Sequence, residues 1–540
     1  MAEIPGSPPW WLEMLSDALD ARAQKVREAE NWYSGDHPIP DPPPNTLAHY
    51  DHETRVAFDR LARLGITNFV GPVVDVPASK LRVEGFRFGD GTPAGDAEAW
   101  TIWQRNHLDA DSDIGNETAL KTGAVYALVW AGADDKAQIT IEDPSQSIVA
   151  YRPGTRRERA AGLKRWVDES GMLFATLYLP NGIWKYKGVS RPEGGVPRTS
   201  NPTAMAFFDT PRSTSQLVLP SGVSRWTQRT VEGEEWPLPN PLGVVPLVEL
   251  SVNGPVRRPA FGGGLPEFSR QLTDQRRINQ TMLNMLITME HQAFRQRWVV
   301  GWTPPVNKTT GEVDKLAVLK AGASTFMMFG DSAETVKVGE FAQADFAPFL
   351  QAIERDVKSI AATSATPPYA FLLGDMINVA ADSLARIEGQ LTSKIRRHQR
   401  GLGEGWEEVL RLALAVEGSA KASDTSSSII WAEAEERTGA EQVEIARAIK
   451  ELGGPDEAVW AALPGIDQQE ALRWKRSTEA GTILSDSRQL SAAEMIQKLY
   501  LGVGVVVTRE EARNILRDAG VDLSEIGPED FPEPVEPVAP

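Results

Sequence analysis

Two helical patterns separated by consecutive prolines constrain this chain most strongly. Between 341 and 362, apolar residues recur at steps of three and four, which places them on one stripe of an α-helix. They are Phe346, Phe349, Leu350, Ile353, Val357 and Ile360. Pro367 and Pro368 end this helix, because proline lacks a backbone donor and pushes the preceding residue out of helical geometry. A longer helix is predicted at 379–416, so an interrupted loop at 363–378 joins two helices.

The later helix has an apolar stripe of its own. Its members are Leu384, Ile387, Leu391, Ile395, Leu402 and Trp406. Beyond it, a polar linker is expected at 418–428, and capping-box patterns predict a helical region over 430–526. The tail at 527–540 is acidic and proline-rich, and we expect it to be disordered.

The part of the chain before these helices predicts an α+β fold. Helical spacing covers 8–34, 52–64 and 97–121, whereas alternating apolar and polar residues between 123 and 250 predict an antiparallel meander of strands. A long helix is predicted at 266–297, and short strands follow at 298–340. The chain therefore runs out along one helix, forms a small β tip and returns along another helix.

Three glycines precede the long helix. Gly262, Gly263 and Gly264 match neither the Gly-x-Gly-x-x-Gly pattern after a strand nor a P-loop with its Lys and Ser or Thr. A hinge is therefore expected here in preference to a nucleotide site.

Composition limits the classes of function. With 540 residues, the chain is longer than one hydrophobic core usually serves. The net charge of −18 argues against tight wrapping of nucleic acid, which needs Lys and Arg to displace counterions, and the absence of cysteine excludes disulfides and thiolate sites. No secretory signal and no apolar stretch of ~20 residues are found, so no membrane partner is expected.

The candidate metal sites fail on spacing. The segment Asp109–Asp113 resembles the start of a calcium loop, but Ile114 stands where the loop needs glycine and Leu120 where it needs glutamate. His49 and His52 have acidic neighbours but do not form a His-Glu-x-x-His motif. We expect no catalytic residue, no metal ligand and no cofactor.

Basic residues gather on the two long helices. Arg276 and Arg277 lie on the first, and Lys394, Arg396 and Arg397 lie on the second. Each group has the charge to contact DNA phosphates or acidic groups of a neighbouring subunit. The plainer interpretation is that they form salt bridges or solvate a helix.

Short motifs in a fixed order connect these elements. They are Trp32–Pro38, Asn68–Asp75, Leu81–Phe86, Asn240–Val248, Ala365–Gly374 and Ala381–Leu384. Together with the order of helix, β tip, helix, break and helix, they resemble the portal proteins, or head-to-tail connectors, of tailed bacteriophages, in particular siphophages that infect actinobacteria.

The resemblance implies a non-enzymatic ring, usually of twelve subunits, at a unique capsid vertex. Such a ring is the channel through which double-stranded DNA enters during packaging and leaves during ejection. The implied partners are the terminase large subunit, a head-completion adaptor, and the major capsid and scaffolding proteins. The implied location is the virion, after assembly in the cytoplasm of the bacterial host.

The resemblance also assigns parts to the chain. It implies a wing at 1–265, stem helices at 266–297 and 341–362, a β clip at 298–340, a tunnel loop at 363–378, a helix and linker returning to the wing at 379–429, and a crown at 430–526. The loop residues expected to face DNA are Phe371, Leu372, Asp375, Met376 and Asn378. Acidic character agrees with passage of DNA, because an acidic lining repels phosphate.

Two alternatives come from other classes of function. One is a nucleic-acid-processing enzyme with a metal site built from carboxylates. The other is a different capsid-associated adaptor or scaffold. An image of the assembled protein and an assay for DNA cleavage distinguish them.

Overall fold

The computed structural model describes residues 4–40, 52–89, 95–132, 134–155, 157–169, 171–190, 223–254, 261–293, 297–300, 337–340, 345–371, 381–435, 439–454 and 459–460. The chain divides into two compact units. The first contains 1–83 and 97–435, and the second contains 84–96 and 436–540.

Two antiparallel sheets form the centre of the first unit. The smaller has the order β3 (Ala137–Glu142), β2 (Ala124–Ala131) and β9 (Leu247–Ser251). The larger is a meander of β4 (Ser147–Tyr151), β5 (Arg159–Val167), β6 (Leu173–Leu179), β7 (Gly182–Ser190) and β8 (Val223–Gln228). The mixed α+β class and the antiparallel pairing are confirmed, but the expected single meander is two sheets.

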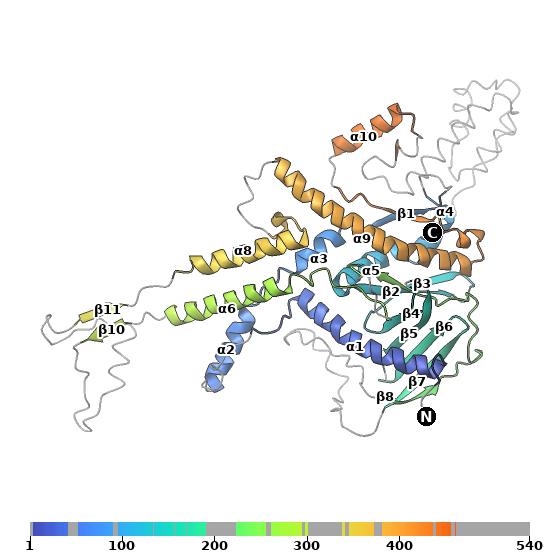
Figure 1. Cartoon of the computed structure of the whole chain (residues 1–540), viewed down its shortest axis with the longest axis horizontal. Helices are drawn as coiled ribbons and strands as arrows, with labels where there is room; N and C mark the ends of the chain where they lie inside the picture. The colour runs from blue at the N-terminus through green and yellow to red at the C-terminus, as the bar shows by residue number, and fades with distance from the viewer. Residues whose placement is uncertain are drawn as a thin grey trace, which may run out of the picture. The chain divides into compact units, whose positions relative to one another are not determined.

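Helix α1 (Pro8–Ser34) covers the larger sheet, as Figure 1 shows. Leu12, Leu15 and Leu19 recur at helical spacing and are buried against alternate residues of the strands, such as Leu163 and Leu177. The opposite side of these strands meets the smaller sheet in a second buried cluster. The alternation of side chains along a strand thus gives the sheet two different faces.

Helix α9 (Ala381–Val416) contacts all three strands of the smaller sheet. Its predicted stripe is confirmed from Leu391 onward, since Ile395, Leu402 and Trp406 are fully buried. The side chains of Leu384 and Ile387 lie outside the described residues. At ~1.5 Å per residue the helix is about 54 Å long. It therefore extends well beyond the sheet that it covers.

The first unit also contains shorter helices. They are α2 (His52–Leu64), α3 (Gly71–Ala78), α4 (Ala97–Arg105), α5 (Leu108–Thr122), and the 3₁₀ turns η2 (Pro368–Phe371) and η4 (Ala420–Ser423). Among them, α3, α4 and η4 contact α9, and α2 contacts α6 (Leu272–Ala293). The single helix expected at 97–121 is two helices, because His107 adopts a left-handed conformation with φ 55°. The segment Asp109–Asp113 lies in the first turns of α5. The linker expected at 418–428 holds η4, and β12 (Ser428–Trp431) follows it.

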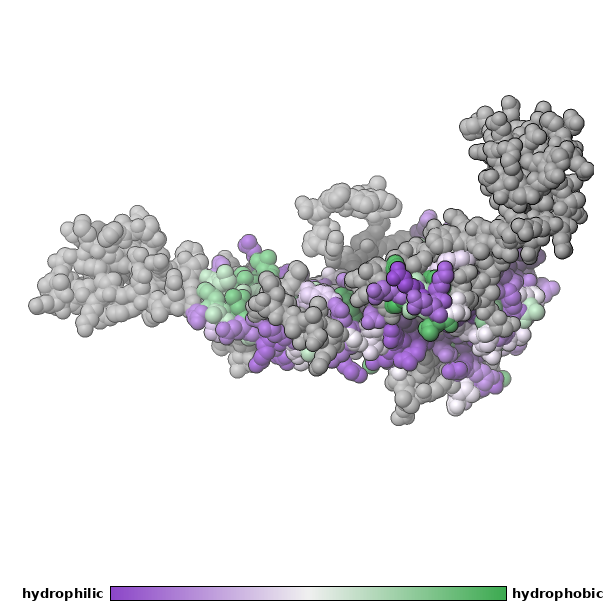
Figure 2. Space-filling view, turned by 90° about the horizontal axis from the view of Figure 1, so that it is seen from above, coloured by the Kyte–Doolittle hydropathy of each residue, from purple (hydrophilic) through white to green (hydrophobic). Residues whose placement is uncertain are grey.

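Helices α6 (Leu272–Ala293) and α8 (Ala347–Ser364) lie side by side (Figure 1). Beyond them β10 (Arg297–Val300) pairs antiparallel with β11 (Lys337–Glu340). Figure 2 shows hydrophobic residues gathered towards the left of the coloured part of the chain. Leu350 of α8 is 55% exposed. The remainder of the predicted β tip lies outside the described residues.

The second unit is described over a small part of its length. It contains most of β1 (Val83–Arg87), where the rings of Phe86 and Phe88 meet edge to face, and α10 (Gly439–Glu451). The rest of the predicted crown and the tail lie outside the described residues. None of the described helices is long and apolar enough to cross a membrane.

The three glycines before α6 pack tightly against other segments of the backbone, which differs from the hinge expected there. Gly262 and Gly263 have φ values of 67° and 98°, and the Gly263 N–H donates to a carboxylate oxygen of Glu249 at 2.9 Å. A Cβ at Gly264 would overlap the carbonyl oxygens of Val252 and Gly123. Only glycine allows the chain to enter α6 along this path.

We expect Gly264→Ala to destabilise the first unit by about 3 kcal/mol or more, because backbone atoms cannot move away from the added methyl group. The thermal unfolding midpoint of the purified protein measures this loss. Gly389→Ala is the matched control, since a Cβ there meets no atom within 4 Å. Alanine within the helix should instead stabilise it by roughly 0.5–1 kcal/mol. Equal midpoints for the two variants would contradict the packing role of Gly264.

Candidate functional site

The motifs Trp32–Pro38 and Asn68–Asp75 meet at one end of the α6–α8 pair. We call this end the helix-pair base. His37 Nε2 lies 2.9 Å from the carbonyl oxygen of Trp32, and His37 Nδ1 lies 3.0 Å from Nδ2 of Asn279 in α6. Burial lowers the pKa of His37, which favours a neutral ring. A neutral ring with its proton on Nε2 donates to Trp32 and accepts from Asn279.

The second motif is held by amide side chains of α6. Gln275 donates to the carbonyl oxygen of Thr67 at 2.7 Å and accepts from the Phe69 N–H at 2.9 Å. The Asn279 side chain contributes as well, since its Oδ1 accepts from the Thr67 N–H at 3.2 Å. These bonds satisfy backbone groups of a half-buried, non-helical segment, which cost free energy if they are left without partners away from water. The N-terminal motifs therefore fix where α6 starts.

Gln271, which directly precedes α6, and two residues of α6 are joined to α8 by a polar ladder of three rungs. The rungs are Gln271–Thr363 at 3.2 Å, Asp274–Ser359 at 2.9 Å and Arg277–Asp356 at 3.1 and 2.9 Å. Residue numbers rise along α6 as they fall along α8, so the helices are antiparallel. The Arg277–Asp356 rung is bidentate, which is the strongest form of this interaction.

A buried ion cluster ties the same base to α9. Lys394 Nζ lies 3.0 Å from Glu267 Oε1, and His398 Nε2 lies 3.2 Å from Glu267 Oε2. The three side chains are 4%, 2% and 6% exposed for Lys394, His398 and Glu267. Burial acts to raise the pKa of Glu267, but the contact with His398, the charge of Lys394 and a hydrogen bond from Asn253 outweigh it and lower the pKa to about 2. Glu267 is therefore ionised.

Lys394 also completes the end of α8. Its ammonium group donates to the carbonyl oxygen of Ser364 at 2.9 Å, and Ala365 turns the chain with φ 52°. The last carbonyls of a helix lack partners within the helix and carry partial negative charge, so a cation is favourable there. One ammonium group thus joins the segment before α6, the end of α8 and the middle of α9.

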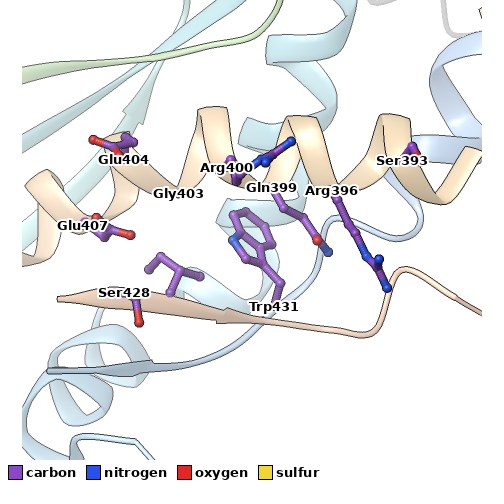
Figure 3. Close-up of a pocket in the computed structure, with 10 residues that line it drawn as sticks. Ser393, Arg396, Gln399, Arg400, Gly403, Glu404, Glu407, Ser428 and Trp431 are labelled. Carbon is purple, nitrogen blue, oxygen red and sulfur yellow. The ribbon is translucent and has the colours of Figure 1, made fainter. Parts of the chain in front are cut away.

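An open groove lies further along α9, between this helix and β12 (Figure 3). Arg396 and Arg400 line one part of it, and Glu404 and Glu407 line another. Burial, with the nearby charge of Glu404, raises the pKa of Glu407. The groove is therefore basic towards the start of α9 and acidic towards its end.

Most of the predicted loop residues lie outside the described residues. Phe371 is 6% exposed, and its ring centre lies 6.4 Å from that of Phe69. The other four are Leu372, Asp375, Met376 and Asn378, and they lie outside the described residues. Phe371 thus anchors one end of the loop in this chain.

The predicted basic residues have distinct surroundings. Arg276 lies over the Trp32 ring, with its guanidinium carbon 5.4 Å from the ring centre, and Arg277 pairs with Asp274 and Asp356. Lys394 is buried in the ion cluster. Arg396 and Arg397 are exposed on α9.

Sequence reasoning missed Glu267, Gln275 and Asn279. A signal for the two amides was present, because Gln271, Gln275 and Asn279 recur every four residues and form a polar stripe along α6. Glu267 lies in a turn, where spacing carries no such signal. Among the described residues, no group of three or more His, Asp or Glu could hold a metal ion.

Comparisons with known proteins agree on one family. Residues 12–482 match the model described as "Phage portal protein, SPP1 Gp6-like". The chain is 25% identical over 415 residues to the portal protein of Mycobacterium phage D29, an alignment that covers 74% of this chain and 73% of that protein. It is 26% identical over 350 residues to the portal protein of Mycobacterium phage L5, covering 64% of this chain and 63% of that protein.

Solved structures resemble the chain more distantly. One is a chain from the neck of an empty gene transfer agent particle computed with C6 symmetry, with a TM-score of 0.38, 10% identity, and coverage of 77% of this chain and 91% of that chain. Another is from the virion of a native gene transfer agent particle, with the same TM-score and identity and coverage of 79% and 94%.

We expect a double-mutant cycle on Lys394→Met and Glu267→Gln to show strong coupling. Either single change leaves one buried group without its partner and should cost about 3–5 kcal/mol, whereas the double change removes both charges. The coupling should be on the order of 1–3 kcal/mol. Hydrogen exchange of the α8 and α9 amides measures it as a change in opening free energy.

The exposed pair Glu354–Lys358 on α8 is the matched control for that cycle, since both side chains are at least 40% exposed. Its coupling should be about 0.5 kcal/mol or less. Similar values for the two pairs would contradict a special role for the buried cluster.

Proposed function

The chain belongs to the SPP1 Gp6-like family of phage portal proteins, and on this premise we propose that twelve copies form a ring at one vertex of the capsid. Members of the family are structural components of the virion, not enzymes, and the ring is the channel for DNA entry and exit. The carboxylate-metal enzyme considered above has no support from the comparisons.

The observation that carries the assignment of parts is the antiparallel pair α6–α8 leading to the paired strands β10 and β11. On this basis the stem comprises 266–297 and 341–362, and the clip comprises 298–340. The wing comprises 1–265 with the 379–429 segment, and the crown comprises 430–526. The helix-pair base then joins stem to wing, which explains why so many motif residues gather there.

The tunnel loop at 363–378 is proposed to face the channel axis. Its described end, Phe371, is buried, so the DNA-facing residues of this proposal are Leu372, Asp375, Met376 and Asn378. Asp375 repels phosphate, and the other three offer small steric or polar contacts. Such a loop guides DNA without holding it.

Neighbouring subunits are proposed to meet along the stem. Leu350 of α8 and Met289 of α6 are 55% and 48% exposed, and Figure 2 shows hydrophobic residues gathered together on the surface, as at interaction sites. Arg396 and Arg397, exposed on α9, are proposed to contact an acidic surface of the next subunit or DNA. Arg276 and Arg277 already have partners within the chain, which favours the structural interpretation for both.

The partners follow from the place of a portal in assembly. The clip is proposed to bind the terminase large subunit during packaging and a head-completion adaptor afterwards. The wing is proposed to contact the major capsid and scaffolding proteins. Assembly is proposed to occur in the cytoplasm of the bacterial host.

Electron microscopy of the purified protein tests the proposal directly. We expect rings with a central hole, and their symmetry gives the subunit number. Incubation with DNA and magnesium or manganese should leave the DNA uncut. A compact monomer at every concentration, or metal-dependent cleavage, would contradict a portal.

Asp375→Lys tests the loop. A ring of such lysines would attract phosphate where the natural residue repels it. We expect normal rings but reduced packaging of DNA per particle, measured in an assembly reaction with terminase and procapsids. Glu451→Lys on α10 makes the same charge change elsewhere and should package normally. Normal packaging by Asp375→Lys would remove this loop from the channel.

A further inference from the structure

One face of the larger sheet combines aromatic rings with cations. We define the basic aromatic face by Lys164 and Trp166 of β5, Phe174 of β6, Lys187 of β7, and Arg229 just after β8. The strand register places Trp166 beside Phe174, and Phe174 beside Lys187. The residues that alternate with them face α1, so these five lie on the other face.

The two rings are covered by cations. Trp166 and Phe174 are stacked with ring centres 5.7 Å apart. The Arg229 guanidinium lies 4.8 Å from the Phe174 ring centre and 5.7 Å from that of Trp166, and Lys164 Nζ lies 5.7 Å from the Trp166 centre. The cation–π contacts restrain the guanidinium beside the rings, and a guanidinium has several N–H donors that an acceptor can use.

The charges on this face are only partly balanced. Lys164 pairs with Glu142 at 2.7 Å, and the neighbouring Lys185 pairs with Glu234. Among the described residues, no carboxylate forms an ion pair with Lys187 or with Arg229. Lys187 is exposed, and Arg229 is half-buried. In a chain with a net charge of −18, this face therefore carries two cations that have no acidic partner in the part of the chain that the structure describes.

We propose that the basic aromatic face is a docking surface for an acidic peptide segment of a partner protein. A carboxylate on the peptide would accept hydrogen bonds from the edge of the stacked Arg229 guanidinium, and a second would pair with Lys187. Charge-assisted hydrogen bonds to a guanidinium that is already held in place lose little side-chain entropy on binding. The interaction does not depend on the ring or on its channel.

The same observations disfavour nucleic acid as the occupant. Single strands bind through aromatic faces on which bases stack, but here cations occupy the faces of both rings. Duplex DNA binds through many cations that neutralise phosphates, whereas this face has two unpaired ones. A short segment with a few carboxylates needs neither a free ring face nor a large number of cations.

Fluorescence anisotropy on the full-length protein provides the test. The probe is a labelled peptide of alternating glutamate and alanine, and the comparison probes are a lysine–alanine peptide, oligothymidine and a short DNA duplex. We expect the acidic peptide alone to bind, with an affinity that falls as salt is added. Absence of binding, or tighter binding of either nucleic acid, would overturn the proposal.

Variants locate the binding to this face. Arg229→Gln should weaken binding about tenfold, equivalent to about 1.4 kcal/mol. Lys187→Gln, at an exposed position that folding does not require, should weaken it severalfold. Arg152→Gln is the matched control, because it removes the same charge from an exposed pair on the β4–β5 hairpin. Lys187→Glu combined with Arg229→Glu should reverse the preference towards the lysine–alanine peptide.

The outcomes separate clearly. Loss of binding in Lys187→Gln and Arg229→Gln, with binding retained in Arg152→Gln, supports the proposal. Unchanged binding in both face variants would overturn it, since the peptide would then bind elsewhere.

Discussion

The contact of Lys394 with Glu267 is the interaction on which the arrangement of the long helices depends. Burying two charges costs several kcal/mol each, and the pair recovers this only with good geometry and further hydrogen bonds. Two such bonds are present, from Lys394 to the Ser364 carbonyl oxygen and from Asn253 to Glu267, and His398 Nε2 lies 3.2 Å from the Glu267 carboxylate. Apolar packing alone would let α8 and α9 take a range of angles. The ion pair selects one of them, because any other leaves a buried charge without a partner.

Packing on the sheet side limits the remaining freedom of α9. Trp406 is fully buried, meets Trp103 edge to face at 5.2 Å and donates to Asn116 at 3.0 Å. Gly405 has no room for a Cβ beside Leu250. The helix is thus held at its centre by charge and along its later half by close contact. The buried ion pair and the close packing together join the sheets to the α6–α8 pair.

Periodic features could be predicted from the sequence, and long-range ones could not. The stripe of Ile395, Leu402 and Trp406 is visible because burial repeats with the turn of the helix. The pairing of β9 with β2 is invisible, because strands more than a hundred residues apart have no local signal of register. The break at His107 lacks the glycine or proline that usually marks one. Glu267 was missed because its partners come from distant parts of the chain.

The polar ladder between α6 and α8 makes this helix pair mechanically stiff. An apolar seam would tolerate sliding, since one leucine can replace another in the same groove. Here each rung matches a particular donor to a particular acceptor, so a shift by one turn of about 5.4 Å would break all three at once. A force applied at the β10–β11 end is then transmitted along the length of the α6–α8 pair. The helix-pair base receives this force, and Lys394 passes it to α9, which its contacts with the smaller sheet hold in place.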